Sequence, residues 1–168
     1  SEIVDATIAN PNLLQFRRSA VPLASMPNDL DLDSFSMDST LTQGQPLNVT
    51  ANWKILREYS NLDSLKIKWK LETDDDTVVF DQTTNLLTQS SLKTLPSNTF
   101  IKEHYTLRIP TDLLRGKYRL TLHTSDLSNS TSLLTFSDHL TITPRKRTFT
   151  VPEMLHPVSA VFGDTIEL

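Results

Sequence analysis

The chain has 168 residues, 38% of them hydrophobic and 21% charged, so it is long enough for one domain with a true core and too apolar to be disordered. Its net charge of −4 argues against a nucleic-acid-binding surface, because such surfaces depend on clustered Lys and Arg side chains. The absence of cysteine excludes disulfides, thiolate metal sites and thiol catalysis, and no apolar stretch is long enough to insert into a membrane.

The start of the chain predicts little regular structure. Residues 1–27 contain three prolines and only short apolar pieces, which indicates an extended lead-in that packs on the domain or pairs at a sheet edge. A strand is then expected over residues 30–37. Its apolar positions slip by one residue around Asp33 and Ser34, which predicts a β-bulge.

The next segments alternate strictly between apolar and polar residues, as strands with one buried face do. Residues 47–55 place Trp53 on the apolar phase, and residues 65–71 place Trp69 there, opposite three lysines. Both segments therefore predict strands that bury one face and expose the other.

Two later segments repeat this pattern. One runs from Tyr105 to Ile109 and stops at Pro110, and the other runs from Tyr118 to Leu122 after a turn at Gly116. We expect these two strands to pair as neighbours. Shorter strand candidates lie at residues 78–80, 140–142 and 149–151, and helix signals are scarce.

These patterns predict an all-β fold: an antiparallel immunoglobulin-like or fibronectin-like β-sandwich of about seven to nine strands over residues 28–151. Tyr105 and Tyr118 join the two tryptophans in the expected core. Residues 81–100 and 125–138 are expected to form long loops. Residues 152–168 predict a linker and the start of a further strand or repeat, or a segment that returns to the same sandwich; the first reading implies an excised piece of a longer chain.

The sequence contains no recognisable catalytic motif. Its three glycines lie far apart, so neither a phosphate-binding loop nor a nucleophile elbow is formed. His104 and His123 share the polar phase of strands expected to pair, and could meet there in a zinc site, although outward solvated side chains are favoured. The acidic run Asp74–Asp76 could hold calcium, but a turn is favoured. We therefore predict no catalytic, metal-binding or cofactor-binding residue.

Candidate contact residues are also few. Trp53 and Trp69 are expected in the core rather than stacked on a sugar, whereas Tyr59 and Phe100 are better placed for exposure. The basic run 145–147 could touch anionic lipid headgroups, but a solvated strand entry is favoured. Any ligand-binding residues stay unassigned.

Several short sequence segments, in expected strands and turns, resemble those of β-sandwich modules. These modules are appended to bacterial membrane glycosyltransferases of the lipid-carrier-dependent, protein-mannosyltransferase-like family. The segments are LDSF at 32–35, QGQPL at 43–47 with Trp53, EHYTLRIP at 103–110, LLRGKY at 113–118, and FGDTIEL at 162–168, which looks like the opening of a following repeat. The sequence departs from the pattern in two places: Ser34 stands where such modules usually have Gly, and Leu114 and Arg115 precede Gly116 where Pro is common. The resemblance carries over no catalytic residue, because in that family the chemistry belongs to the membrane-embedded portion.

Three functions follow as hypotheses. The first, which the resemblance implies, is a non-catalytic accessory or scaffolding domain on the extracytoplasmic face of a bacterial membrane, partnered with the rest of a longer chain. The second is an independent carbohydrate- or protein-binding module that uses the two expected loops. The third is a hydrolase whose site uses His104, His123 and the acidic run 74–76.

Overall fold

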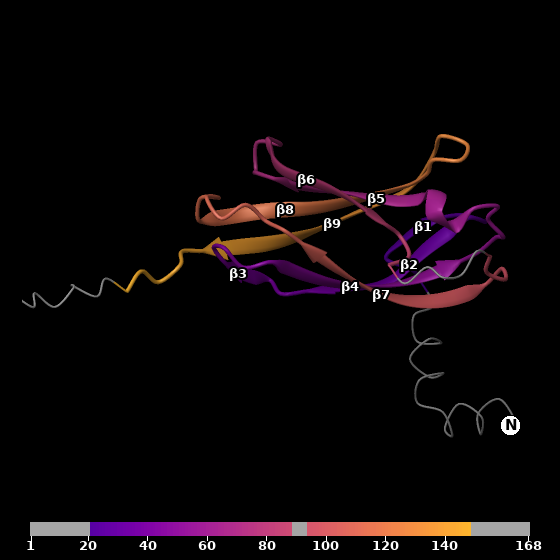
Figure 1. Cartoon of the computed structure of the whole chain (residues 1–168), viewed down its shortest axis with the longest axis horizontal. Helices are drawn as coiled ribbons and strands as arrows, with labels where there is room; N and C mark the ends of the chain where they lie inside the picture. Colours follow the sequence, from indigo (N-terminus) through magenta and orange to yellow (C-terminus); the bar gives the residue numbers. More distant parts are fainter. Residues whose placement is uncertain (1–20, 89–93, 149–168) are drawn as a thin grey trace, which may run out of the picture.

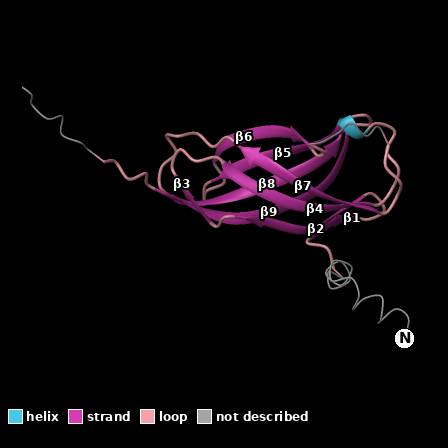
Figure 2. Cartoon of the chain, turned by 60° about the horizontal axis from the view of Figure 1, so that its bottom comes forward, coloured by secondary structure: helices cyan, strands magenta, loops and turns pink. Residues whose placement is uncertain are grey.

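The computed structural model describes residues 21–88 and 94–148. In this part of the chain nine strands form two sheets that lie face to face, as Figures 1 and 2 show from two directions. One turn of 3-10 helix, η1 (Leu62–Ser64), is the only helical segment among the described residues. The strands are β1 (Ala24–Met26), β2 (Leu30–Met37), β3 (Thr40–Thr42), β4 (Leu47–Ile55), β5 (Leu65–Glu72), β6 (Val78–Asn85), β7 (Thr99–Leu107), β8 (Gly116–Asp126) and β9 (Thr131–Thr143).

The strand order confirms the predicted immunoglobulin-like sandwich. One sheet has the order β1-β2-β4-β7 and the other β3-β9-β8-β5-β6. All neighbouring strands are antiparallel except β3, which runs parallel to β9. The chain thus passes along one sheet in β2, crosses to the edge of the other in β3, and returns in β4.

The predicted pairing of the strand at Tyr105 with the strand at Tyr118 is wrong. Tyr105 lies in β7, at the edge of the four-stranded sheet, and Tyr118 lies in β8, inside the five-stranded sheet. Strands that follow each other in sequence often pair, but the connection after β7 here crosses between the layers.

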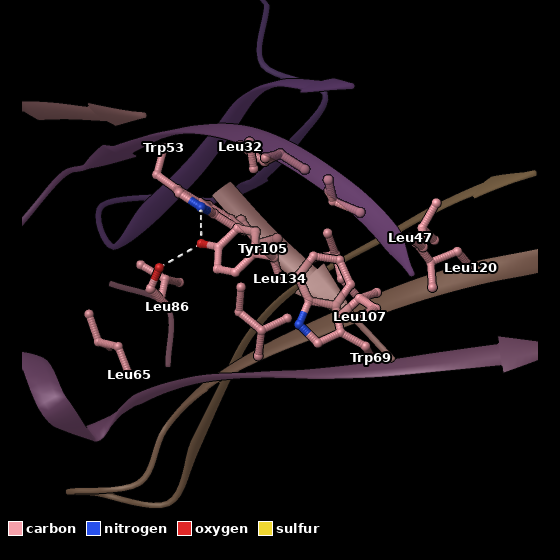
Figure 3. Packing of buried hydrophobic residues seen from close by; sticks show 14 of the residues in the cluster. Leu32, Leu47, Trp53, Leu65, Trp69, Leu86, Tyr105, Leu107, Leu120 and Leu134 are labelled. Carbon is pink, nitrogen blue, oxygen red and sulfur yellow. Dashed lines mark hydrogen bonds between the residues drawn. The ribbon is translucent and has the colours of Figure 1, made fainter. Parts of the chain in front are cut away.

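The core fills the space between the sheets and confirms the apolar phases read from the sequence. Trp53 and Trp69 are both 0% exposed, and Tyr105 lies between them, with its ring centroid 5.2 Å from that of Trp69. The Tyr105 hydroxyl accepts a hydrogen bond from Trp53 Nε1 at 2.8 Å and donates one to the Leu86 carbonyl at 2.5 Å (Figure 3). The Trp53 indole N–H and the Tyr105 hydroxyl therefore both have hydrogen-bond partners inside the core.

Two features of immunoglobulin-like sandwiches are present: a buried tryptophan on an interior strand and a tyrosine at the corner between the sheets. The disulfide that often accompanies them is absent, because the chain has no cysteine. Trp69 lies on a central strand, and its Nε1 donates to Thr84 Oγ1 of β6 at 2.9 Å. Tyr118 stands near the start of β8, where its hydroxyl donates to the Leu114 carbonyl at 2.7 Å and closes the corner between the sheets.

The element boundaries confirm some expectations and correct others. The bulge in β2 is present, as a register shift between Leu32 and Ser34. The end of the lead-in forms β1, which pairs at the edge of β2. The expected loop at 125–138 is instead a hairpin whose connection spans only residues 127–130.

The other expected loop, 81–100, is also shorter. Strand β6 continues to Asn85 and β7 begins at Thr99, so both ends of that range are strand. The strand expected at 149–151 and the segment 152–168 lie outside the described residues.

Candidate functional surfaces

The outer face of the five-stranded sheet is polar and mostly cationic. Lys66, Lys68 and Lys70 of β5 lie on it, next to Thr121 and His123 of β8. His123 hydrogen-bonds through Nδ1 to Thr135 Oγ1 at 2.8 Å and through Nε2 to Ser132 Oγ at 3.3 Å. Both of its ring nitrogens are therefore engaged by hydroxyls of β9.

The second histidine of the sequence hypothesis lies on the opposite outer face. His104 belongs to β7 of the four-stranded sheet and its Nδ1 is 2.9 Å from Thr50 Oγ1 of β4. The less favoured alternative, in which His104 and His123 meet in a zinc site, is wrong, because the two side chains point outward from different sheets. The expectation that both histidines face outward is confirmed.

The acidic run 74–76 forms the turn between β5 and β6, which was the interpretation that the sequence favoured over a calcium site. Asp76 takes a left-handed conformation with φ 63°, and the Thr73 hydroxyl and the Thr77 amide donate to the Asp75 carboxylate. These hydrogen bonds, that from Thr73 foremost, lower the pKa of Asp75. No three His, Asp or Glu side chains gather as a metal site within residues 21–88 and 94–148.

Arg119 ties this turn to the sheet. Its Nη2 lies 2.5 Å from Asp76 Oδ1 and 2.9 Å from Glu72 Oε2. The hydrogen bond to Asp76, followed by that to Glu72, raises the pKa of Arg119. The acidic residues thus have structural partners.

The two candidate contact aromatics differ in outcome. Tyr59 was predicted to be exposed, and this is wrong: it is 1% exposed, and its hydroxyl donates to the Asp29 carbonyl at 3.0 Å. Burial, the largest effect, raises the pKa of Tyr59 to about 12. Phe100 is 42% exposed, as predicted, on the outer face of the four-stranded sheet, with Lys54 Nζ 5.1 Å from its ring centroid.

A polar cluster that the sequence did not indicate joins three connections at one end of the sandwich. Asp126, whose side chain is 4% exposed, accepts hydrogen bonds from Ser64 Oγ and Ser128 Oγ, both at 2.6 Å, and lies 3.6 Å from Arg57 Nη2. Arg57 also donates to Asp29 at 2.6 Å and covers the ring of Tyr59. This cluster is a structural clamp, since its groups saturate one another.

Two shallow hollows lie at the other end, and neither was foreseen. One, of about 510 Å³, is lined by β3 and β9 with Asp74, Lys117 and His139. The second, of about 490 Å³, is lined by Gln43, Gly44, Thr111 and residues 145–148. The basic run 145–147 follows β9 and is exposed, as the solvated reading predicted, and it contributes to this second hollow. The strand that it was expected to enter, at 149–151, lies outside the described residues.

The comparisons with known proteins show the fold alone. No family model and no curated protein matches the chain. Among solved structures, the C-terminal domain of Wzt has a TM-score of 0.57 at 14% identity, over 80% of this chain and 87% of that one. A Niemann-Pick type C2 protein from Japanese carpenter ant has a TM-score of 0.50 at 10% identity, over 66% and 89%. No helix among the described residues could span a membrane. The chain is a β-sandwich module.

Proposed function

We propose that the chain is a non-catalytic accessory module of a larger protein, a membrane glycosyltransferase, and works on the extracytoplasmic face of a bacterial membrane. The observation that carries the non-catalytic part is the placement of the chemically capable side chains. His104 and His123 point away from each other on opposite faces, and the acidic run 74–76 is held in a turn. A hydrolytic site needs its acid and base on one cleft.

The link to a glycosyltransferase rests on the resemblance of roughly residues 30–151, together with the tail 162–168, to modules of that family. A module of this kind spaces the catalytic portion from its surroundings or guides its glycan. Both tasks need a rigid body with polar outer faces, and this sandwich has them: side-chain hydrogen bonds such as Thr50 to His104 and Thr106 to Asn48 cross its outer face.

The non-catalytic assignment is tested by offering the purified chain a panel of nitrophenyl glycosides. We expect no rate above that of buffer. A rate that the wild type shows and that His104→Ala or His123→Ala abolishes would overturn the proposal, because a contaminating hydrolase would be indifferent to either substitution.

A second candidate function is direct glycan binding through the outer face of the four-stranded sheet. Phe100 is the only exposed aromatic residue among those described, and its ring is flanked across the strands by Lys54, with Asn52 and Lys102 as the next pair. An aromatic face covers the C–H side of a sugar ring, while amide and ammonium groups bind its hydroxyls.

A glycan array with the wild type and two variants separates the two candidates. Binding that Phe100→Ala removes and Val78→Ala retains would assign the sugar to this face, since Val78 is 46% exposed but lies on the other sheet. Absence of any bound glycan would leave the spacing role and exclude the binding role.

A further inference from the structure

The hollow that includes the basic run is assembled from three separate connections. Gln43 and Gly44 come from the turn between β3 and β4, Thr111 from the connection between β7 and β8, and residues 145–148 from the segment after β9. Its volume is about 490 Å³, and since one water takes up about 30 Å³ in the liquid, the hollow has room for a phosphate group together with several waters.

Gln43 holds these three connections together. Its backbone N–H donates to the Thr143 carbonyl at 2.9 Å and its side-chain amide donates to the Leu113 carbonyl at 2.5 Å. Its side-chain oxygen in turn accepts from the Arg145 backbone N–H at 3.3 Å. The first residue of the basic run is thereby fixed against the turn of β3.

Gly44 keeps the wall beside Gln43 open. Its φ of 84° is the left-handed conformation that favours glycine, and the nearest side-chain atom to an added Cβ would be Thr111 Cγ2 at 3.9 Å. The absence of a side chain here leaves Thr111 accessible from the hollow.

The lining is cationic and rich in donors. Arg145, Lys146 and Arg147 contribute three positive charges and Thr111 and Thr148 contribute hydroxyls, and among the described residues no carboxylate lines the hollow. Guanidinium groups present several N–H donors in a planar fork that matches the oxygens of a phosphate, and an ammonium adds a point charge. Although the chain has a net charge of −4, three cations gather at this end of the sandwich, and none of the lining residues that the structure describes is acidic.

We propose that this hollow binds a phosphate group, with Arg145 and Arg147 as its principal ligands and Gln43 as the residue that positions Arg145. The phosphate belongs either to a free phosphate ester or to a lipid headgroup, and the same donors serve both. This site is independent of the proposed accessory function, because it uses neither outer sheet face.

Titration of the ¹⁵N-labelled chain with inorganic phosphate, at ionic strength held constant with sodium chloride, tests the proposal. We expect saturable shifts of the Gly44, Thr111 and Arg145 amides. Arg145→Ala and Arg147→Ala should each weaken binding about two- to fivefold, the range for one exposed charged contact. The matched control is Arg115→Ala, an exposed arginine outside the hollow, which should leave the affinity unchanged.

A second arm identifies the source of the phosphate. Vesicles of phosphatidylcholine with phosphatidylglycerol are compared with vesicles of phosphatidylcholine alone by co-sedimentation. Pelleting with the anionic vesicles that the double variant Arg145→Ala/Arg147→Ala abolishes assigns a lipid headgroup, and phosphate binding without pelleting assigns a free ester.

The proposal is overturned if phosphate shifts these amides no more than chloride does, or if Arg115→Ala weakens binding as much as Arg145→Ala. Retention of the backbone amide spectrum of the core in each variant shows that the fold is intact, so either outcome is decisive.

Discussion

Replacing Tyr105 by phenylalanine removes one oxygen from the centre of the sandwich and breaks two hydrogen bonds at once. The hydroxyl accepts from Trp53 Nε1 at 2.8 Å and donates to the Leu86 carbonyl at 2.5 Å (Figure 3). Trp53 and Leu86 are both 0% exposed and Tyr105 is 3% exposed, so water does not reach the groups left behind. The variant therefore leaves one buried donor and one buried acceptor unpaired.

The expected cost follows from those two groups. An unpaired buried polar group costs about 1–3 kcal/mol, and the greater hydrophobicity of phenylalanine returns part of this, so Tyr105→Phe should lower the free energy of unfolding by about 2–4 kcal/mol. With a urea m-value of about 2 kcal/mol per molar, typical of a small domain, the midpoint should fall by roughly 1–2 M.

The matched control is Tyr118→Phe. The Tyr118 hydroxyl also donates to a backbone carbonyl, that of Leu114 at 2.7 Å, but Leu114 lies in a connection and is 77% exposed. Water can replace the lost donor there, so we expect a loss of about 1 kcal/mol or less. Urea unfolding followed by tryptophan fluorescence measures both variants. If Tyr105→Phe costs no more than Tyr118→Phe, the buried hydrogen-bond chain does not stabilise the core as argued.

Three further predictions concern the charged and titrating groups. Burial alone would raise the pKa of Asp126, but hydrogen bonds from Ser128 and Ser64 and the charge of Arg57 outweigh it and lower the pKa. A lowered carboxyl pKa stabilises the fold at pH values above the unfolded pKa of 3.8, so Asp126→Asn should cost about 1–2 kcal/mol at neutral pH, and this cost should shrink as the pH falls below 3.8 and the carboxylate becomes protonated. Urea midpoints at several pH values check this, and a pH-independent difference would contradict it. Because burial raises the pKa of Tyr59 to about 12, its stabilisation is complete below the ordinary tyrosine pKa of 10.0 and is lost as the pH rises through 12. Tyrosinate absorbance should show this residue titrating late, and Tyr59→Phe should remove that step; a full transition near pH 10 would refute the burial argument. Arg119→Gln should lower the free energy of unfolding only slightly, and by less in high salt, because Asp76 is exposed to solvent while Glu72 is only partly buried. A loss that salt does not reduce would assign a packing role instead.

The alternation of apolar and polar residues predicted the faces of the strands well. It identified Trp53, Trp69, Tyr105 and Tyr118 as core residues, and all four are buried. Alternation depends on the local geometry of a single strand, so it assigns a side chain to a face without any knowledge of the neighbouring strand. The pairing of β7 with β8 was wrong for that reason, because sheet membership depends on contacts that are distant in sequence.

The missed strand ends have a different cause. Near the ends of two strands, polar residues occupy the inward positions where the alternation requires apolar ones. They are Thr124 and Asp126 in β8 and Gln82 and Thr84 in β6. The structure satisfies them by specific hydrogen bonds, such as Thr124 Oγ1 to the Leu134 carbonyl and Trp69 Nε1 to Thr84 Oγ1. A buried polar residue with a partner is stable, but its partner is not visible in the sequence.

The candidate surfaces were predictable only in part. The exposure of Phe100 followed from its place on the polar phase, whereas the burial of Tyr59 depends on how the connection after β4 folds back onto Asp29. The basic hollow needed three connections to meet, and the run 145–147 supplied its only sequence signal. The sequence therefore shows where charged residues gather along the chain, and only the fold shows which other residues lie beside them.

The central claim, that this sandwich is an accessory module of a membrane glycosyltransferase, is tested most directly by sequencing the complete open reading frame that encodes it. We expect a single long frame in which several apolar segments, each of about 20 residues as membrane-spanning helices require, precede the residue numbered 1 here. A frame that encodes the sandwich without such segments would contradict the claim.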